Sequence, residues 1–139
     1  MTKVKHETVK DVMSENLVMI DGLTTIDNAL NIMRKNNISS LIVNRRNESD
    51  EYGMLKVGDI ANEVIVPDLA PERTSAYQVM QKPVLSMRAN MNIRYAIRLL
   101  AKYGETRALV IENDKAIGIV TLGDMILRYT DSGDQAVNS

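Results

Sequence analysis

The chain of 139 residues contains no cysteine, tryptophan or phenylalanine, and it has a single histidine. Without cysteine it can form no disulfide, no thiolate nucleophile and no Cys-based zinc or iron–sulfur site. The histidine, His6, lies in a charged N-terminal stretch and completes neither a Ser-His-Asp triad nor a histidine metal cluster. The G-x-x-x-x-G-K-[ST] phosphate loop is absent as well. We therefore predict a protein that is not an enzyme, with no catalytic residue, no metal site and no required cofactor.

Strong net charge and long apolar runs are also missing. The 17 Lys and Arg residues nearly balance the 18 Asp and Glu residues, so the formal net charge is −1. Such a chain has no overall basic field to hold nucleic acid or an anionic membrane. The N-terminal residues show no apolar stretch of a signal peptide, and no segment approaches the roughly 18 apolar residues of a membrane-spanning helix. We expect a cytoplasmic protein that binds neither nucleic acid nor membrane.

The sequence does contain an internal repeat, and such a repeat determines how the whole fold is organised. The offset is 67 residues in the first part of each copy, where Val12-Met13 returns as Val79-Met80. It falls to 65 after the polar loop 44–51, where Gly53 returns as Gly118, because the first copy has two extra residues there. The other matches are Ile26 with Ile93, Ala29 with Ala96, Lys35 with Lys102, Val43 with Val110, Gly58 with Gly123, and Asp59 with Asp124.

Each copy has the pattern of a β-α-β-β-α unit preceded by a helical turn, at 8–13 or 75–80. A short apolar stretch follows, at 17–20 or 84–87, and predicts a strand. Apolar residues at 26, 29, 30 and 33, and at 93, 96, 97 and 100, predict amphipathic helices. We expect Thr25 and Asn92 as N-caps of these helices, and ends near 36–37 and 103–104. Strands are expected at 40–44, 52–56, 107–112 and 116–121, with a last helix starting near Gly58 or Gly123.

These patterns predict an α/β (α+β) protein made of two repeats, 8–66 and 75–131, joined by a linker at 67–74. Residues 132–139 are polar and are expected to be disordered. Three short strands and two helices cannot cover both faces of a sheet in one copy alone. We therefore expect the two sheets to face each other about a pseudo-twofold axis, with the helices outside and ligand-sized clefts between the copies.

The doubled pattern resembles the cystathionine β-synthase (CBS) domain family over about residues 8–131. The opening is x-V-M-x, and the closing motif G-h-h-[ST]-x-x-D stands in the second copy as Gly118-Ile119-Val120-Thr121-Leu122-Gly123-Asp124. A tandem pair resembles a stand-alone Bateman module. The resemblance implies a regulatory module that binds an adenosine-containing ligand such as AMP, ADP, ATP, S-adenosylmethionine or NAD. It also implies a homodimer that acts on an unknown partner protein in trans.

The same resemblance assigns ligand contacts in the second copy. It places the ribose on Thr121 and Asp124, a phosphate on Arg107, and the adenine along Val84, Leu85 and Ser86. The chemistry fits, because a carboxylate can accept both hydroxyls of a ribose diol and a guanidinium can pair phosphate oxygens in a bidentate way. Thr-x-x-Asp before an apolar helix is also the pattern of a simple N-cap, so both interpretations stay open.

The first copy departs from the motif. Lys56 stands where Ser or Thr is expected, and Ser40 stands where the second copy has Arg107, while Asp59 is retained. A lysine cannot accept a hydrogen bond, so this degenerate site is either empty or its Lys56 adds positive charge toward a phosphate bound in the second site. The alternative for the whole protein is a structural dimerisation module in which no cleft holds a ligand.

Overall fold

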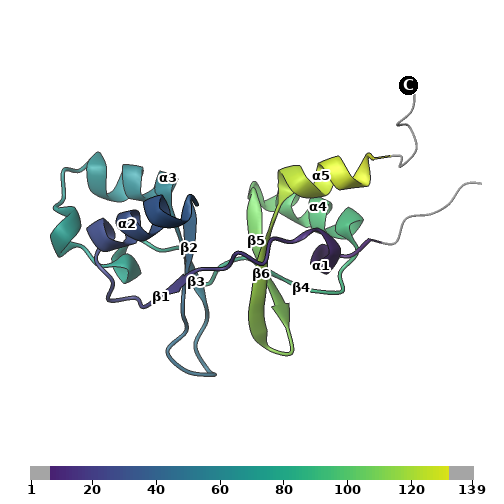
Figure 1. Ribbon diagram of the computed structural model, residues 1–139, viewed down its shortest axis with the longest axis horizontal. Coiled ribbons are helices and arrows are strands. Elements are labelled where there is room, and N and C mark those ends of the chain that lie inside the picture. Colours follow the sequence, from purple (N-terminus) through teal and green to yellow (C-terminus); the bar gives the residue numbers. More distant parts are fainter. Residues whose placement is uncertain (1–6, 132–139) are drawn as a thin grey trace, which may run out of the picture. The chain divides into compact units, whose positions relative to one another are not determined.

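The computed structural model describes residues 7–131, so His6 and the 132–139 tail lie outside the described residues. The chain divides into two compact units. Figure 1 shows the elements of both, coloured along the sequence. We name residues 17–84 the N-terminal unit. Residues 85–131, together with the N-terminal segment 7–16, form the C-terminal unit. Each unit has its own three-stranded sheet and its own helices.

The N-terminal unit holds the sheet β1-β2-β3. Strand β1 (Met19–Ile20) runs parallel to β2 (Ser40–Val43), which is antiparallel to β3 (Gly53–Lys56). Helix α2 (Ile26–Asn36) connects β1 to β2, as a parallel pair requires. Helix α3 (Val57–Ile60) follows β3 and continues as the helical turns η1 (Ala61–Ile65).

The C-terminal unit repeats this plan with the sheet β4-β5-β6. Strand β4 (Ser86–Arg88) is parallel to β5 (Arg107–Glu112), and β5 is antiparallel to β6 (Lys115–Thr121). Helix α4 (Ile93–Tyr103) lies between β4 and β5, and α5 (Leu122–Tyr129) follows β6. The predicted mixed α/β fold of two β-α-β-β-α copies is confirmed.

Local signals account for most helix and turn positions. The Asn92 side chain accepts a hydrogen bond from the Arg94 N–H at 2.9 Å, so this N-cap is as predicted. Thr25 occupies the N-cap position of α2, but its hydroxyl instead donates to Asp27 Oδ1 at 2.6 Å. Helices α2 and α4 end at Asn37 and Gly104, which both adopt positive φ as expected. The last helices begin at positions 57 and 122, one residue before the predicted glycines.

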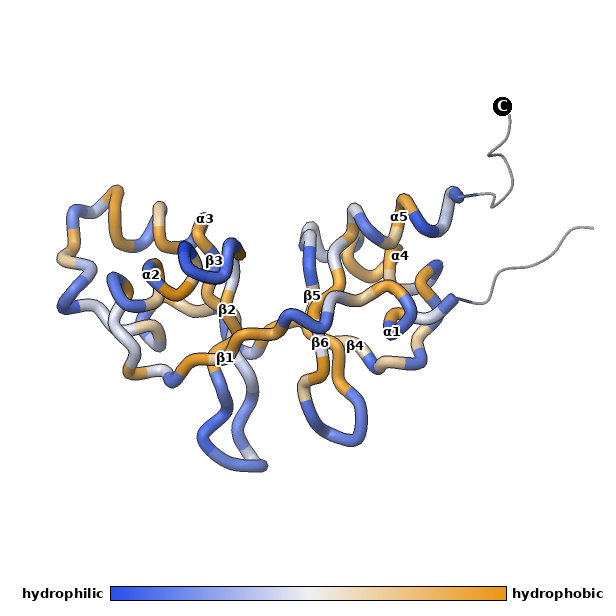
Figure 2. The backbone as a smooth tube through the Cα atoms, viewed as in Figure 1, coloured by the Kyte–Doolittle hydropathy of each residue, from blue (hydrophilic) through white to orange (hydrophobic). Residues whose placement is uncertain are grey.

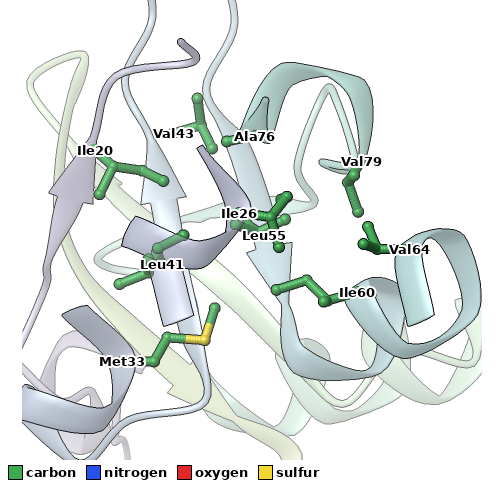
Figure 3. Packing of buried hydrophobic residues seen from close by; sticks show 11 residues of the cluster. Ile20, Ile26, Met33, Leu41, Val43, Leu55, Ile60, Val64, Ala76 and Val79 are labelled. Atoms are coloured by element: carbon green, nitrogen blue, oxygen red, sulfur yellow. The ribbon is translucent and has the colours of Figure 1, made fainter. Parts of the chain in front are cut away.

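Each unit has a separate apolar core. Figure 3 shows side chains of α2, the three strands, α3 and the turns that follow converging in the N-terminal unit. The matching core of the C-terminal unit is built from α4, α5, the sheet and the N-terminal segment 7–16. In Figure 2 the strands are largely apolar, whereas the 44–51 loop between β2 and β3 is hydrophilic. The repeat in the sequence is thus a repeat in core positions.

The opening turns are exchanged between the units. Helix α1 (Val9–Val12) belongs to the C-terminal unit, where the N–H of Val9 donates to Met91 O at 2.8 Å and Ser14 forms a two-way bridge to Ile119 of β6. The turn η3 (Ala76–Gln78) packs on the N-terminal unit, and Gln81 bridges Met54 of β3 in the same way. Each compact unit therefore takes its opening turn from the other sequence repeat.

Candidate functional site

Five of the predicted ligand-binding residues come together in the C-terminal unit. Arg107 begins β5 and lies directly opposite Thr121, which ends β6. Leu85 O accepts the Leu109 N–H at 2.9 Å, and Ser86 is aligned with Leu109, so the start of β4 lies beside the start of β5. Residues 85, 86, 107, 121 and 124 therefore gather at one end of the sheet β4-β5-β6.

Thr121 is the N-cap of α5. Its Oγ1 accepts a hydrogen bond from the Asp124 N–H at 3.1 Å, which is the bond expected of a simple N-cap. The hydroxyl hydrogen can still donate, because capping uses only an oxygen lone pair. Asp124 is exposed and forms no ion pair within the described part of the chain. The cap therefore leaves both Asp124 carboxylate oxygens accessible to hydroxyl donors.

Arg107 gives this end of the sheet a positive charge. The residue is only partly exposed, and its Nε atom is buried. Direct cross-strand neighbours have Cβ atoms about 4.5–5.5 Å apart, so the guanidinium stem starts next to the Thr121 side chain. An exposed carboxylate and a partly exposed guanidinium thus flank one threonine.

The corresponding place in the N-terminal unit is occupied by its own side chains. Ser40, which is buried, lies opposite Lys56 across β2 and β3. The Lys56 Nζ is 3.3 Å from Gln81 Oε1 and 3.9 Å from Asp59 Oδ2. The ammonium group therefore pairs with the one carboxylate that this copy retains from the motif.

The remaining predicted contact, Val84, is not part of the C-terminal unit. It is the last residue of the N-terminal unit, where it is buried and its N–H donates to Tyr52 O at 3.0 Å. Lys56, Asp59 and Ser40 also belong to that unit. The structure thus groups the predicted residues into two sets, one in each unit.

Comparison with known proteins follows the same division. The family model of the CBS domain matches residues 9–66 and again residues 76–131. The chain belongs to the CBS domain family. The two matches together cover most of its length, so this CBS pair accounts for both compact units.

The CBS pair is similar to parts of longer proteins. An uncharacterised protein of Methanopyrus kandleri is 30% identical over 96 residues, which are 68% of this chain and 48% of that protein. The chain thus spans about half the length of this curated relative. The crystal structure of a hexameric CBS-CP12 protein from bloom-forming cyanobacteria is 29% identical with a TM-score of 0.83, covering 88% of this chain and 67% of that one.

A second similar structure contains a bound nucleotide. It is the CBS domain of a bacterial CNNM/CorC family Mg²⁺ transporter in complex with ATP, 21% identical with a TM-score of 0.72. The match covers 88% of this chain and 86% of that chain. At this identity the similarity concerns the fold.

Sequence reasoning missed Gln81, which holds Lys56 in the degenerate CBS copy. Its signal was its position, because Gln81 follows Val79-Met80 just as Ser14 follows Val12-Met13, and both bridge the closing strand of a unit. Among the described residues of this CBS pair, no three His, Asp or Glu side chains gather to hold a metal ion. Over the same residues, no helix is long and apolar enough to cross a bilayer.

Proposed function

We propose that this CBS pair is a regulatory module that binds an adenosine-containing ligand, AMP, ADP, ATP, S-adenosylmethionine or NAD, at Thr121, Asp124 and Arg107. Tandem CBS modules are generally regulatory and ligand-binding. The ATP complex of the transporter CBS domain supports the adenine nucleotide as the ligand class for this fold. In this proposal Leu85 and Ser86 contribute backbone groups to the base edge, with Val84 preceding them in the chain.

The observation that carries the proposal is the cross-strand pair of Arg107 and Thr121, with Asp124 three residues further on. A ribose diol needs an acceptor with two oxygens, and a phosphate needs a cation with several N–H donors. These two groups stand on either side of the same threonine. The N-terminus of α5 adds a favourable dipole for an anion.

The degenerate copy supports a one-sided site. In the N-terminal unit Asp59 pairs with Lys56, and a ligand would have to break this ion pair before its hydroxyls could reach the carboxylate. Ser40 offers no positive charge where Arg107 stands in the other unit. We therefore propose that the site at Asp59 and Ser40 stays empty, and that Lys56 closes it.

Regulation requires the ligand to favour one of two states of the protein, because a ligand with equal affinity for both shifts nothing. We propose that the bound nucleotide changes a surface that a partner protein recognises in trans, without catalysis, in the cytoplasm. A purified sample should accordingly leave the nucleotide chemically unchanged, which chromatography of the recovered ligand would check.

The sharpest test is the substitution Asp124→Asn, with Asp59→Asn as the matched control. We expect an adenosine ligand to raise the melting temperature of the wild type by an amount that grows with concentration, as binding to the folded state requires. Asparagine keeps the shape of the side chain but loses the charge and one acceptor oxygen. Asp124→Asn should weaken binding by about tenfold or more, equal to about 1.4 kcal/mol, whereas Asp59→Asn should bind as the wild type does.

The opposite results have a clear meaning. No melting shift with any of the five ligands would refute the nucleotide proposal and favour a structural dimerisation module that needs no ligand. Equal losses in the two variants would instead place nucleotides in both copies. Mass spectrometry of small molecules released on denaturation would identify a ligand that purifies with the protein.

We also propose that the protein forms a homodimer through α5. Its side chains Ile126, Leu127 and Tyr129 are 41%, 71% and 50% exposed, an apolar face that water disfavours. The oligomeric CBS-CP12 relative shows that a similar chain can assemble. Multi-angle light scattering of the purified chain gives the mass that tests this.

A further inference from the structure

A pocket lies wholly within the N-terminal unit, at the carboxyl ends of the parallel strands β1 and β2. Its volume is about 670 Å³, within the range of small-molecule sites. Three segments form the pocket: residues 21–23 after β1, residues 43–46 at the end of β2, and residues 77–82, which begin in the turn η3. Its lining residues are Asp21, Gly22, Leu23, Val43, Asn44, Arg45, Arg46, Tyr77, Met80 and Lys82.

This pocket is separate from the closing motif of its unit. Lys56 pairs with Ser40 at the start of β2, whereas the pocket lies beyond Val43 at the end of β2. The two places are therefore at opposite ends of one strand. Ligands of open α/β sheets also gather at the carboxyl ends of parallel strands, where loops leave the sheet.

The charge of the lining is positive. Arg45, Arg46 and Lys82 contribute three positive charges, whereas Asp21 in the lining and Asp50 just outside it contribute two negative charges, so one net positive charge remains. One oxygen of Asp21 already accepts the Leu23 N–H at 2.7 Å and so serves the turn itself. Guanidinium groups pair phosphate oxygens in a bidentate way, and a phosphate monoester carries nearly two negative charges.

The cations are held in place. Asp50, just outside the lining, accepts hydrogen bonds from Arg46 Nε at 2.9 Å and Lys82 Nζ at 3.0 Å. The guanidinium carbon of Arg45 lies over the Tyr52 ring, 5.0 Å from its centroid, a cation–π contact that favours this position of the side chain. Side chains that are already ordered lose less entropy when an anion binds.

The pocket also offers an aromatic face. Tyr77 is 53% exposed, and its backbone N–H donates to Gly22 O at 2.9 Å. A Cβ added at Gly22 would come within 3.3 Å of the Tyr77 Cβ, so glycine allows the tyrosine to lie this close to the β1 loop. Leu23, 74% exposed, adds an apolar side chain to the rim.

The equivalent place in the C-terminal unit has the same backbone but different chemistry. The N–H of Lys10 donates to Ala89 O at 3.0 Å, which is the counterpart of the Tyr77 bond to Gly22. Lysine thus replaces the tyrosine, and Glu112 stands where the N-terminal unit has Arg45. These two form an ion pair at 3.1 Å, so the counterpart place is bridged by its own charges.

We propose that the pocket between Arg45, Lys82 and Tyr77 binds a small organic phosphate, with the phosphate on the basic side chains and a flat or apolar group on Tyr77. The site is independent of the nucleotide site at Asp124, and its ligand does not need a ribose. The protein then has a second ligand site, which belongs to the N-terminal unit.

The test is titration of the full-length, ¹⁵N-labelled protein with phenyl phosphate, which joins a ring to a phosphate monoester. We expect amide shifts in segments 21–24, 43–46 and 77–82, and a dissociation constant at or below about 1 mM. Inorganic phosphate and phenol should each bind about tenfold more weakly or worse, because each has half of the ligand. Shifts centred on Thr121 and Asp124 instead would overturn the proposal.

The decisive variant combines Arg45→Glu with Tyr77→Lys. It copies into the N-terminal unit the pair that already exists on the same backbone as Glu112 and Lys10, so the fold should be kept. Binding of phenyl phosphate should weaken by about tenfold or more. Arg45→Gln alone, which keeps Tyr77, should cause a smaller loss in the same direction.

The matched control is Lys10→Gln with Glu112→Gln, which opens the counterpart place and should leave binding unchanged. Asp124→Asn should also leave it unchanged, which separates this site from the proposed nucleotide site. Equal affinity of the wild type and the Arg45→Glu, Tyr77→Lys variant would contradict the proposal, as would the absence of any binding by the wild type.

Discussion

At the scale of single residues, Asp50 shows how a charge orders a polar loop. Its carboxylate accepts hydrogen bonds from the side chain and backbone of Arg46 and from Lys82. These bonds, those of Arg46 first, hold the pKa of Asp50 far below its usual range. In the polar 44–51 loop, the structure therefore gives Arg45, Arg46 and Asp50 specific partners.

We predict a pH signature for this carboxylate. A lowered pKa in the folded state means that ionised Asp50 stabilises the fold above the unfolded-state pKa of about 4 and that this contribution is lost as the pH falls below it. Asp50→Asn should therefore lower the melting temperature by a few degrees from about pH 5 to 8. The difference from wild type should shrink below about pH 4.

Melting curves across this range check the prediction. Glu48→Gln in the same loop is the control, because Glu48 is exposed and should change little at any pH. A difference between Asp50→Asn and wild type that stays constant down to about pH 2 would show that the carboxylate does not act through its charge.

At the scale of elements, the exchanged opening turns depend on glycine in the closing strands. Gly118 of β6 lies against the N-terminal segment 7–16. A Cβ added at Gly118 would come within 2.6 Å of the backbone oxygen of Ser14. Gly53 of β3 has the same role, although its nearest neighbour is the flexible end of Met80, at 2.7 Å. The glycine that opens the family motif therefore allows close approach of another strand.

We predict that Gly118→Ala destabilises the protein by about 1–3 kcal/mol, because the added methyl must push the backbone at Ser14 away from β6. Gly123→Ala is the matched control, since its Cβ would meet nothing within 4 Å and alanine favours the helix α5. Urea unfolding of both variants measures the difference. A Gly118→Ala variant as stable as Gly123→Ala would show that the segment 7–16 does not need this contact.

At the scale of the whole molecule, the two units share one plan but not one chemistry. The C-terminal unit keeps Thr121, Asp124 and Arg107, whereas the N-terminal unit has a self-paired Lys56 and a basic pocket at the other end of its sheet. If both proposed sites bind, the two units respond to two different ligands.

Assembly is the prediction at this scale. If α5 forms the dimer contact, Leu127→Glu should place a charge in an apolar interface and give a monomer, because an unpaired buried charge is costly. Leu23→Glu is the control, since Leu23 is equally exposed, at 74% against 71%, but lies in a loop of the other unit. Light scattering of the wild type and both variants measures the mass. A wild type that is monomeric at tens of micromolar would rule out the proposed dimer.

The sequence predicted the features that depend on local chemistry. Asn92 caps its helix, and Asn37 and Gly104 end theirs. The cap at Thr121 was also expected as one of two interpretations. All of these follow from interactions within a few residues.

The exchange of the opening turns could not be predicted in the same way. Val12-Met13 and Val79-Met80 carry the same pattern, so either turn could complete either unit on the evidence of sequence alone. The pairing is decided by distant partners such as Met91 for Val9 and Thr24 for Ala76. The pocket at Tyr77 was missed for the same reason, because its walls come from three segments that lie 20 and 31 residues apart in the sequence.

The exchange also sets an order of events during synthesis on the ribosome. Residues 17–84 form a continuous stretch, so the N-terminal unit can complete its core as soon as residue 84 has emerged. The segment 7–16 emerges earlier, yet all the other buried residues of the core cluster that contains Val9 are encoded after residue 84. The first described part of the chain to be made is therefore the last to find its place. Until then its apolar residues must remain exposed while the other unit is already folded.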